Sequence, residues 1–395
     1  MLKESSAKRK PKIMIIGSIP PPYHGCTIAI QNLLNSRIKE EFDLLHLDTS
    51  DHRDFKNLGK FDLINISLAL KNLLQLAFTC IFKKPDAIYV LPGTNTGSCL
   101  REGLFIILTK LLGNSIIISH FRTSYFKNFY YHSKWIYRRF IDFFLKRTNR
   151  AIVLGECLRP MVEPWFPVDR VDVIPNGTAF DPYPGGKVIK SFDHNNPVQL
   201  TYMSNIDPTK GVLILLEAIK NIFDHTQPFQ LTIAGAWTSS GLEVKKKVEG
   251  FINQSSLREV VRFAGIVAGK TKEELLKETD IFVLPTFYPV EAHPHSIIEA
   301  MAAGCPVIST WHAAIPETVI HGETGILVEK ENVEELARAL KRLIEHPELR
   351  RKMGLTGRRR YEQFYTMDIN ISNMITVFKK ALGAYTVHSP RVGRS

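Results

Sequence analysis

Short apolar runs alternate with helical patterns along most of the chain, and this alternation restricts the folds that are open to it. Residues 12–17 (KIMIIG), 86–91 (DAIYVL) and 115–119 (SIIIS) have the length and composition of buried strands. A second series begins at residues 199–203 and continues at residues 230–235. Because parallel strands need a crossover connection, usually a helix, the alternation predicts an α/β fold with parallel sheets covered by helices.

The chain is too long for one hydrophobic core. It has 395 residues, whereas single cores stop growing at roughly 250–300 residues. Between residues 175 and 197 the pattern gives way to turn-forming stretches such as PNG, DPYPGG and DHNNP. We predict a Rossmann-like domain over residues 1–180, a second one over residues 181–365, and a C-terminal helix with a basic tail over residues 366–395 that packs back on the first domain. The two domains are expected to face each other across a cleft.

The cysteines and the N-terminus predict a cytoplasmic protein. The chain has five scattered cysteines, without a CxxC pair or a spacing that would close a zinc site. Reduced thiols are the simpler interpretation. The basic N-terminus is followed by an apolar run of only about four residues, which is too short for a secretory signal.

The net charge is +12 and the isoelectric point is about 9.4, which favours anionic partners. Phosphorylated substrates, anionic lipid and nucleic acid would all be attracted. No recognised nucleic-acid motif accompanies the charge, so a nucleic-acid partner is not expected. The most apolar stretch, residues 64–82, is interrupted by polar residues including Lys71 and Asn72, which predicts a buried amphipathic helix rather than a membrane span.

Two glutamates separated by seven residues, Glu291 and Glu299, bracket a predicted helix start. Pro285 and Pro289 place Glu291 in a loop after an apolar strand, and Ser296 is the expected N-cap of the next helix. Free N–H groups and the helix dipole at such a terminus favour a phosphate or a sugar hydroxyl. Glu299 lies among apolar helix residues, where an unpaired charge is costly, so a binding role is favoured over two solvated surface glutamates.

The stretch around these glutamates, YPVEAHPHSIIEAMAAGCPVIST (residues 288–310), resembles glycosyltransferase family 4, a retaining family with a GT-B fold. Further matching pieces, in family order, are PPPYHG (20–25), IPNG (174–177), SNIDPTKG (204–211) and GETGILV (322–328). The resemblance implies the GT-B form of the α/β class, in which two Rossmann-like domains face each other. It also implies that the first domain binds the acceptor and the second binds a nucleotide-sugar donor.

By this resemblance, Glu299 would hold the nucleotide ribose and Glu291 would contact the donor sugar. The main chain of four residues at the helix start would reach the sugar and the phosphate: Pro294, His295, Ser296 and Ile297. Lys210 matches the phosphate-binding lysine of the family. A fixed cation there would stabilise the negative charge that develops on the departing nucleoside diphosphate.

The first domain contributes a second set by the same resemblance. His120 matches a histidine that meets the donor sugar or its leaving phosphate, and the adjacent Arg122 indicates an anion site. A lone histidine at a strand end is more often structural, but its strand position and the family match favour function. The chain has Asn205 where the family commonly has arginine, so Arg122 is a candidate substitute for the missing cation. Cys26 replaces a second glycine of the N-terminal loop, and Gly25 remains for close approach of the main chain.

We therefore expect His120, Lys210 and Glu291 to act in catalysis. The expected donor-binding residues are Gly25, Cys26, Arg122, Asn205, Lys210, Pro294, His295, Ser296, Ile297 and Glu299. No DxD carboxylate pair that would clamp a metal–diphosphate occurs in the sequence, so no metal and no cofactor are expected. No second carboxylate is evident as a covalent nucleophile.

The function that the resemblance implies is retaining transfer of a sugar from a nucleotide diphosphate sugar to a glycan or lipid-linked acceptor, in the synthesis of a cell-surface polysaccharide or glycolipid. Two alternatives stay open. One is a nucleotide-sugar epimerase relative, against which the glutamate pair and Lys210 argue. The other is a catalytically silent binding module, which Asn205 motivates.

Residues 121–150 form a basic stretch with interleaved aromatic residues. It holds eight lysines and arginines and one acid, Asp142. Such a helix could contact an anionic membrane peripherally and receive a lipid-linked acceptor. It could equally bury its aromatic face in the core and leave its basic face in water, and the sequence does not separate the two.

Overall fold

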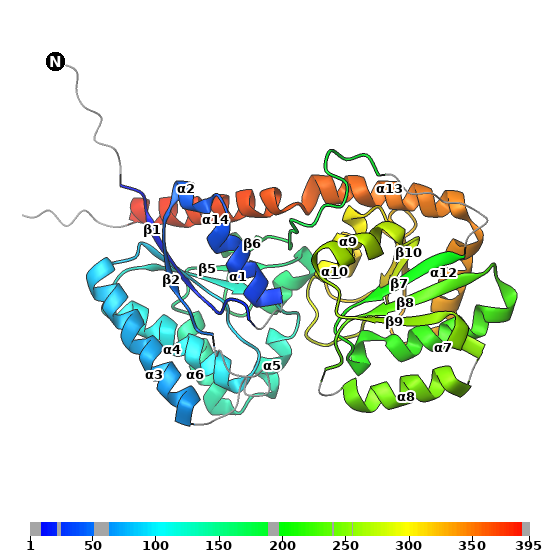
Figure 1. Cartoon of the computed structure of the whole chain (residues 1–395). Helices are drawn as coiled ribbons and strands as arrows, with labels where there is room; N and C mark the ends of the chain where they lie inside the picture. The colour runs from blue at the N-terminus through cyan, green and yellow to red at the C-terminus, as the bar shows by residue number, and fades with distance from the viewer. Residues whose placement is uncertain are drawn as a thin grey trace, which may run out of the picture. The chain divides into compact units, whose positions relative to one another are not determined.

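The computed structural model describes residues 9–21, 25–50, 63–188, 197–238, 241–254 and 256–388. The chain forms two compact units (Figure 1): unit 1 comprises residues 1–174 and 371–395, and unit 2 comprises residues 175–370. The sequence placed these boundaries after residues 180 and 365. Residues 22–24 of the predicted N-terminal loop and the predicted tail after residue 388 lie outside the described residues.

Unit 1 contains a six-stranded parallel sheet with the strand order β2-β1-β3-β4-β5-β6. Its strands are β1 (Lys12–Ile16), β2 (Asp43–Leu47), β3 (Ala87–Val90), β4 (Ile116–Phe121), β5 (Arg150–Val153) and β6 (Val171–Val173). The central strands β1, β3, β4 and β5 are almost wholly apolar and buried, as expected when helices cover both faces of a parallel sheet.

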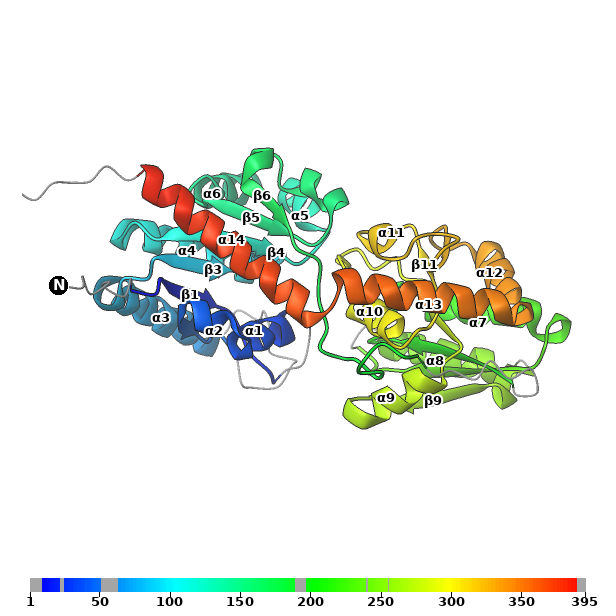
Figure 2. The same ribbon diagram turned by 90° about the horizontal axis from the view of Figure 1, so that it is seen from above.

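Helices cover the two faces of this sheet in separate groups (Figures 1 and 2). One group consists of α1 (Gly25–Asn35), α2 (Ile38–Glu41) and α14 (Met367–His388). The other consists of α3 (Leu63–Phe78) with the π-helical turn η2 (Thr79–Lys83), α4 (Thr96–Leu112) and α6 (Trp135–Leu145). Shorter helices are α5 (Phe126–His132), η3 (Glu156–Met161) and η4 (Val168–Arg170).

The C-terminal helix α14 belongs to unit 1 from Ile371 onward, and there its Phe378 packs against aromatic residues of that unit. The ring of Phe378 lies edge-on to the rings of Phe42 and Tyr89, at centroid distances of 5.9 and 5.8 Å. Lys380 of the same helix bonds Asp172 of β6 at 3.0 Å.

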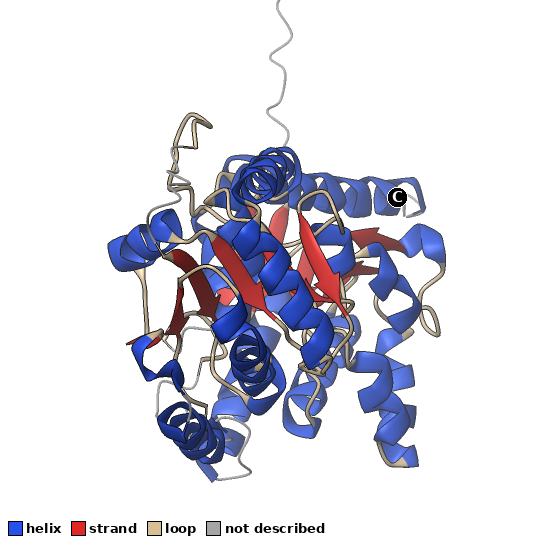
Figure 3. Ribbon diagram, turned by 90° about the vertical axis from the view of Figure 1, so that its right-hand side faces the viewer, coloured by secondary structure: helices blue, strands red, loops and turns tan. Residues whose placement is uncertain are grey.

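Unit 2 contains a second six-stranded parallel sheet, ordered β12-β11-β10-β7-β8-β9. Its strands are β7 (Val198–Met203), β8 (Phe229–Ala234), β9 (Val261–Gly265), β10 (Ile281–Leu284), β11 (Val307–Thr310) and β12 (Gly325–Val328). Helices lie on both sides of the strands (Figure 3).

Helices connect the strands of unit 2, and α12 (Val333–Glu345) and α13 (Pro347–Phe364) follow the last strand. The connecting helices are η5 (Pro208–Lys210), α7 (Val212–Ile222), η6 (Phe223–His225), α8 (Gly241–Gln254), η7 (Ser256–Glu259), α9 (Gly269–Glu278), α10 (His295–Ala302) and α11 (Ile315–Thr318). The described helices include none that is long and apolar enough to span a membrane.

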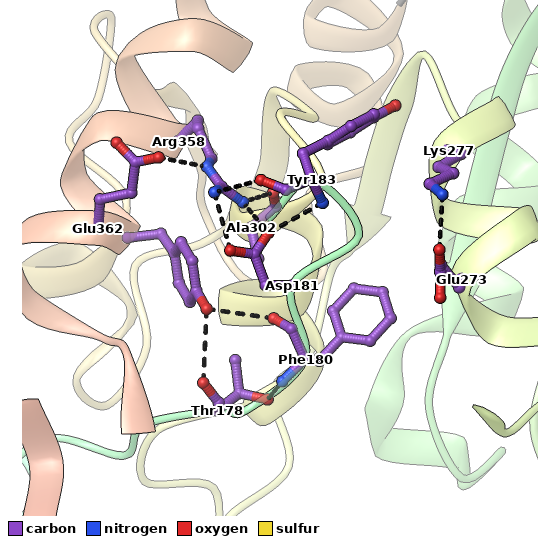
Figure 4. Close-up of polar contacts among 10 residues, drawn as sticks. Thr178, Phe180, Asp181, Tyr183, Glu273, Lys277, Ala302, Arg358 and Glu362 are labelled. Atoms are coloured by element: carbon purple, nitrogen blue, oxygen red, sulfur yellow. Dashed lines mark hydrogen bonds and ion pairs between the residues drawn. The ribbon is translucent and has the colours of Figure 1, made fainter. Parts of the chain in front are cut away.

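A buried arginine ties the segment that enters unit 2 to the rest of that unit (Figure 4). Arg358 of α13 is only 3% exposed, and its guanidinium bonds both carboxylate oxygens of Asp181, at 2.5 and 3.0 Å. It also donates to the carbonyl oxygens of Ala302 and Tyr183 and to the carboxylate of Glu362. The donors of the guanidinium fork are thus satisfied inside the protein.

Replacement of Arg358 by Met is expected to lower the stability of unit 2 by about 3 kcal/mol, because the bonded carbonyl oxygens and Asp181 would lose their partner. Scanning calorimetry of the purified chain would show a lower melting temperature. Arg359→Met is the matched control, since the neighbouring Arg359 is exposed; it should change stability by no more than about 0.5 kcal/mol. Equal effects of the two changes would contradict the role of Arg358.

Candidate functional site

The strand order of unit 2 reverses at β7 and β10, and the loops that follow these two strands meet. β7 pairs with β8 on one side and with β10 on the other, so both loops leave the same edge of the sheet. Ligands in open parallel sheets bind at such a switch point. The N–H of Phe287 donates to the carbonyl oxygen of Thr209 at 2.8 Å. A Cβ on Gly211 would lie 2.2 Å from the carbonyl oxygen of Pro285, so this close approach requires glycine.

Lys210 and Glu291, two of the predicted catalytic residues, form an ion pair across these loops. Lys210 ends the short helix η5, which Asp207 caps by accepting the N–H of Thr209 at 3.0 Å. Its ammonium donates to the carboxylate of Glu291, and both side chains are less than 15% exposed. The ammonium also lies 4.5 Å from the ring centroid of Tyr288. The pair therefore holds a fixed cation, with its counter-charge, at the switch point.

Glu299, the predicted ribose ligand, pairs with a different lysine. Its carboxylate accepts a hydrogen bond from Lys272 of α9 at 2.6 Å, and its side chain is 14% exposed. Burial raises the pKa of Glu299, and the ammonium of Lys272 opposes that rise. Lys272 also lies 4.9 Å from the ring centroid of Phe180. Glu299 is thus held in one position by a neighbouring helix.

The helix that carries Glu299 starts one residue earlier than predicted. α10 begins at His295, Pro294 occupies the N-cap position, and no side chain caps the helix. The expectation that Ser296 is the N-cap is therefore wrong. His295 and Ser296 are half-buried, and Ile297 is fully buried, so a polar ligand could meet Ile297 only through its main chain.

Asn205, which stands where the family commonly has arginine, lies in the loop after β7 with its side chain exposed. The loop after β8 approaches it closely. A Cβ on Gly235 would lie 1.8 Å from the carbonyl oxygen of Ser204, and glycine is required there. The side chain of Asn205 is therefore free to meet a ligand from solvent, but it brings no charge.

The predicted histidine of unit 1 lies one residue before the end of β4, because the strand continues to Phe121. His120 is 2% exposed, and its Nδ1 lies 2.7 Å from the hydroxyl of Tyr89. Tyr89 of β3 pairs in register with Ile118, so Tyr89 and His120 project from the same face of the sheet. In the described part of the chain, Nε2 of His120 has no hydrogen-bond partner.

The surroundings of His120 select one neutral tautomer. Burial, and next the charge of Arg122, hold the pKa of His120 well below its usual value. Burial also raises the pKa of Tyr89, which therefore keeps its proton. If the phenol donates to Nδ1, only the Nε2–H of His120 stays unpaired. The reverse arrangement would leave both the phenol proton and Nε2 unpaired, which costs more.

The remaining predicted residues of unit 1 lie close to this pair. Arg122 is half-buried directly after β4. The charge of Arg122 and the thiol of Cys26 both influence the pKa of Tyr89, after burial. Gly25 and Cys26 form the start of α1. Unit 1 therefore gathers its predicted residues around Tyr89.

Sequence reasoning missed three residues that support the site. Lys272 is one of several lysines in a charged helix and gives no distinguishing signal. Tyr89 is an apolar-looking residue within a strand pattern. Asn176 lies in the IPNG motif, and its amide donates to the carbonyl oxygen of His293 at 2.7 Å. That motif could have indicated a buried asparagine that holds the loop before α10.

No group of three or more His, Cys, Asp or Glu side chains that could hold a metal ion occurs within the described ranges. The five cysteines are all free thiols.

Replacement of Lys272 by Met should make stability depend on the ionisation of Glu299. The buried carboxyl would lose its partner, so its pKa in the folded state would rise further above the unfolded value. The folded chain would then bind more protons than the unfolded chain over that window, and stability would increase as the pH is lowered from 8 towards 5. Urea unfolding at several pH values measures this difference from the wild type.

The double variant Lys272→Met, Glu299→Gln is the control, because it has no carboxyl at this position. Its difference from the wild type should vary less with pH than that of the single variant. A pH-independent difference in the single variant would contradict the pairing.

Replacement of Tyr89 by Phe should remove the tautomer preference of His120, because Nδ1 would lose its hydrogen-bond donor. Long-range ¹H–¹⁵N correlation spectra should show a neutral Nε2–H imidazole in the wild type and a changed tautomer ratio in the variant. His46, whose Nε2 lies 2.9 Å from the carbonyl oxygen of Gly17, provides an internal control. A wild-type spectrum with Nδ1 protonated would refute the assignment.

Comparisons with known proteins show which family and which fold the chain is similar to. Residues 188–360 match the sequence model of the family described as Glycosyl transferases group 1. A putative colanic acid biosynthesis glycosyltransferase of Salmonella typhimurium is 28% identical over 150 residues, which are 36% of this chain and 35% of that protein. The chain spans about a third to a half of the length of several such curated relatives.

Two solved structures have the same fold over nearly the whole chain. Sucrose-phosphate synthase from Thermosynechococcus elongatus has a TM-score of 0.73 and 18% identity, over 95% of this chain and 100% of its own. HepE of Anabaena, in complex with UDP, has a TM-score of 0.69 and 16% identity, over 94% and 100%. The predicted α/β fold of the GT-B kind is confirmed. Unit 2, which contains residues 188–360, is therefore the part of the chain that is similar to the glycosyl transferases group 1 family.

Proposed function

We propose that this chain is a retaining glycosyltransferase. It takes a sugar from a nucleotide diphosphate sugar and transfers it to a glycan or lipid-linked acceptor, in the synthesis of a cell-surface polysaccharide or glycolipid. The observation that carries the proposal is the ion pair of Lys210 and Glu291 at the switch point of a unit that matches the group 1 glycosyl transferases. The UDP in the HepE complex and the colanic acid pathway of the Salmonella relative support the donor and acceptor classes.

The roles of the side chains follow from their chemistry. In the transfer, the bond between the anomeric carbon and the phosphate oxygen breaks, and its electron pair leaves with the nucleoside diphosphate. Lys210 stabilises the charge that develops there. The acceptor oxygen bonds the anomeric carbon on the same face and passes its proton to the departing phosphate. Glu291 orients Lys210 and the sugar, and Glu299 accepts hydrogen bonds from the ribose.

His120 contributes a neutral donor in this proposal. Its Nε2–H would donate a hydrogen bond to the sugar or the leaving phosphate. Because the ring is neutral, it would add no charge that already stabilises the donor before the reaction. Arg122, Gly25 and Cys26 would bind near the phosphates. That the two units face each other across a cleft stays a prediction, as do a metal-independent reaction and a cytoplasmic location with peripheral membrane contact through residues 122–150.

A catalytically silent nucleotide-sugar-binding module is the second candidate. Asn205 favours it, because an exposed neutral amide stands where the family commonly has a guanidinium. Leaving-group stabilisation would then rest on Lys210 and on whatever charge unit 1 supplies.

Replacement of Lys210 by Met should lower turnover by about 10²–10³-fold, since one preorganised group at the leaving phosphate is lost. Glu299→Gln should weaken donor binding. Release of nucleoside diphosphate from labelled UDP-, GDP- and ADP-sugars measures the first, and the thermal shift with each donor measures the second. The assay contains EDTA throughout, and activity is expected to persist.

Lys277→Met is the control for Lys210→Met, because Lys277 of α9 is 38% exposed, pairs with Glu273 and is not among the expected site residues. It should keep wild-type turnover. Wild-type turnover in Lys210→Met would overturn the site. Donor binding without turnover in the wild type would favour the silent module, and activity only after addition of Mg²⁺ would refute metal independence.

A further inference from the structure

The helix α3 turns an apolar stripe outward instead of burying it. Leu70, Leu74 and Phe78 follow one another at intervals of four residues, so they share one face of the helix, and they are 57%, 64% and 56% exposed. Phe82 of η2 extends the stripe at 69% exposed, with its ring centroid 4.6 Å from that of Phe78. Asn72, by contrast, is 7% exposed. The expectation that residues 64–82 form a buried helix is therefore wrong for this face.

The neighbouring helices continue this apolar surface. α3 packs against α4, and α4 packs against α6, so the three form one layer on the sheet (Figure 1). Leu111 of α4 is 77% exposed, and Trp135, Ile136 and Phe143 of α6 are 68%, 59% and 44% exposed. We call these residues together with the stripe of α3 and η2 the outer face of the layer. Exposed apolar residues that gather over three adjacent helices mark an interaction surface.

The charges around the outer face have one sign. Residues 63–84, 96–112 and 126–147 contain two carboxylates, Glu102 and Asp142, and neither is exposed. Glu102 is 5% exposed and bonded by Arg101, and Asp142 accepts hydrogen bonds from Tyr130 and Trp165. The exposed cations are Lys71, Lys83, Lys84, Lys134, Arg139, Lys146 and Arg147.

We propose that the outer face of the α3–α4–α6 layer docks on the surface of an anionic lipid bilayer. Apolar side chains bury in the boundary between headgroups and acyl chains, while flanking lysines and arginines extend to anionic headgroups. Each cation near such a surface adds to the attraction, and no exposed carboxylate of the layer opposes it. Arg147, which stacks on the ring of Phe143 at 3.4 Å, combines both contacts at one point.

The charge pattern favours a bilayer over a second copy of the chain. A two-fold contact through this face would bring the same cations of two chains together, and their repulsion would oppose the apolar contact. An anionic surface supplies the complementary charge instead. The docking itself does not depend on the proposed transferase reaction; that reaction gives it a use, since a lipid-linked acceptor lies in the bilayer.

The test compares two variants of the full chain in vesicle flotation. The stripe variant carries Leu74→Ser, Phe78→Ser and Phe82→Ser, and the control carries Val168→Ser and Ile266→Ser. Val168 and Ile266 are 74% and 77% exposed but lie outside the layer. With vesicles of phosphatidylcholine and 30% phosphatidylglycerol, the stripe variant should partition about tenfold or more weakly than the wild type. The control should partition like the wild type.

The charge contribution is measured separately. Lys83→Ser with Lys84→Ser should weaken binding to the anionic vesicles and reduce its salt dependence. Pure phosphatidylcholine vesicles should bind the wild type weakly. In the anionic vesicles, brominated lipids should quench the wild-type fluorescence, and Trp135→Phe should remove part of that quenching. The quenching measurement does not depend on whether the stripe variant folds.

Wild-type partitioning of the stripe variant, or undiminished quenching in Trp135→Phe, would overturn the proposal. Light scattering without lipid tests whether the outer face joins two chains instead. If the wild type is a dimer and the stripe variant a monomer, the outer face joins two chains and the bilayer assignment is wrong. Because none of these measurements involves sugar transfer, their failure would count against the membrane contact of residues 122–150 but would leave the proposed transfer reaction untouched.

Discussion

The reversal of strand order between β7 and β10 is the constraint on which the candidate site depends. It places two loops that are far apart in sequence at one edge of the sheet, and Gly211 lets their backbones touch. The contact of these loops brings Lys210 to Glu291. A buried ammonium without a partner would be costly, so the carboxylate of Glu291 compensates the charge of Lys210 and holds its side chain in place. A phosphate that binds there meets a preorganised group.

The two glutamates that the sequence singled out have different surroundings. Glu291 lies in the loop and forms an ion pair with Lys210, while Glu299 lies in α10 and forms an ion pair with Lys272 of α9. Each carboxylate thus has its own lysine. In the proposed reaction, one pair would serve the sugar and the leaving phosphate and the other would serve the ribose.

The local patterns in the sequence predicted strands such as β1, β3, β4, β7 and β8 and the loop position of Glu291, because each depends on neighbours along the chain; they did not predict the edge strands β2 and β12. Lys272 could not be found in this way, since its pairing with Glu299 depends on how α9 packs beside α10. Ser296 was wrong as the N-cap because the preceding Pro294 already takes that position. For α3 the apolar content was plain, but the direction of its face depends on what packs against it, and there Asn72 turns inward.

Unit 1 separates its two candidate roles by the two faces of one sheet. Tyr89 contacts Phe378 of α14, and His120 shares its face. The exposed apolar surface belongs to α3, α4 and α6, which cover the opposite face (Figure 2). A bilayer against that layer would therefore leave Tyr89 and His120 uncovered by lipid. Because the sheet lies between them, the residues proposed to bind a bilayer and those proposed to meet a donor do not touch, so a substitution in one group need not disturb the other.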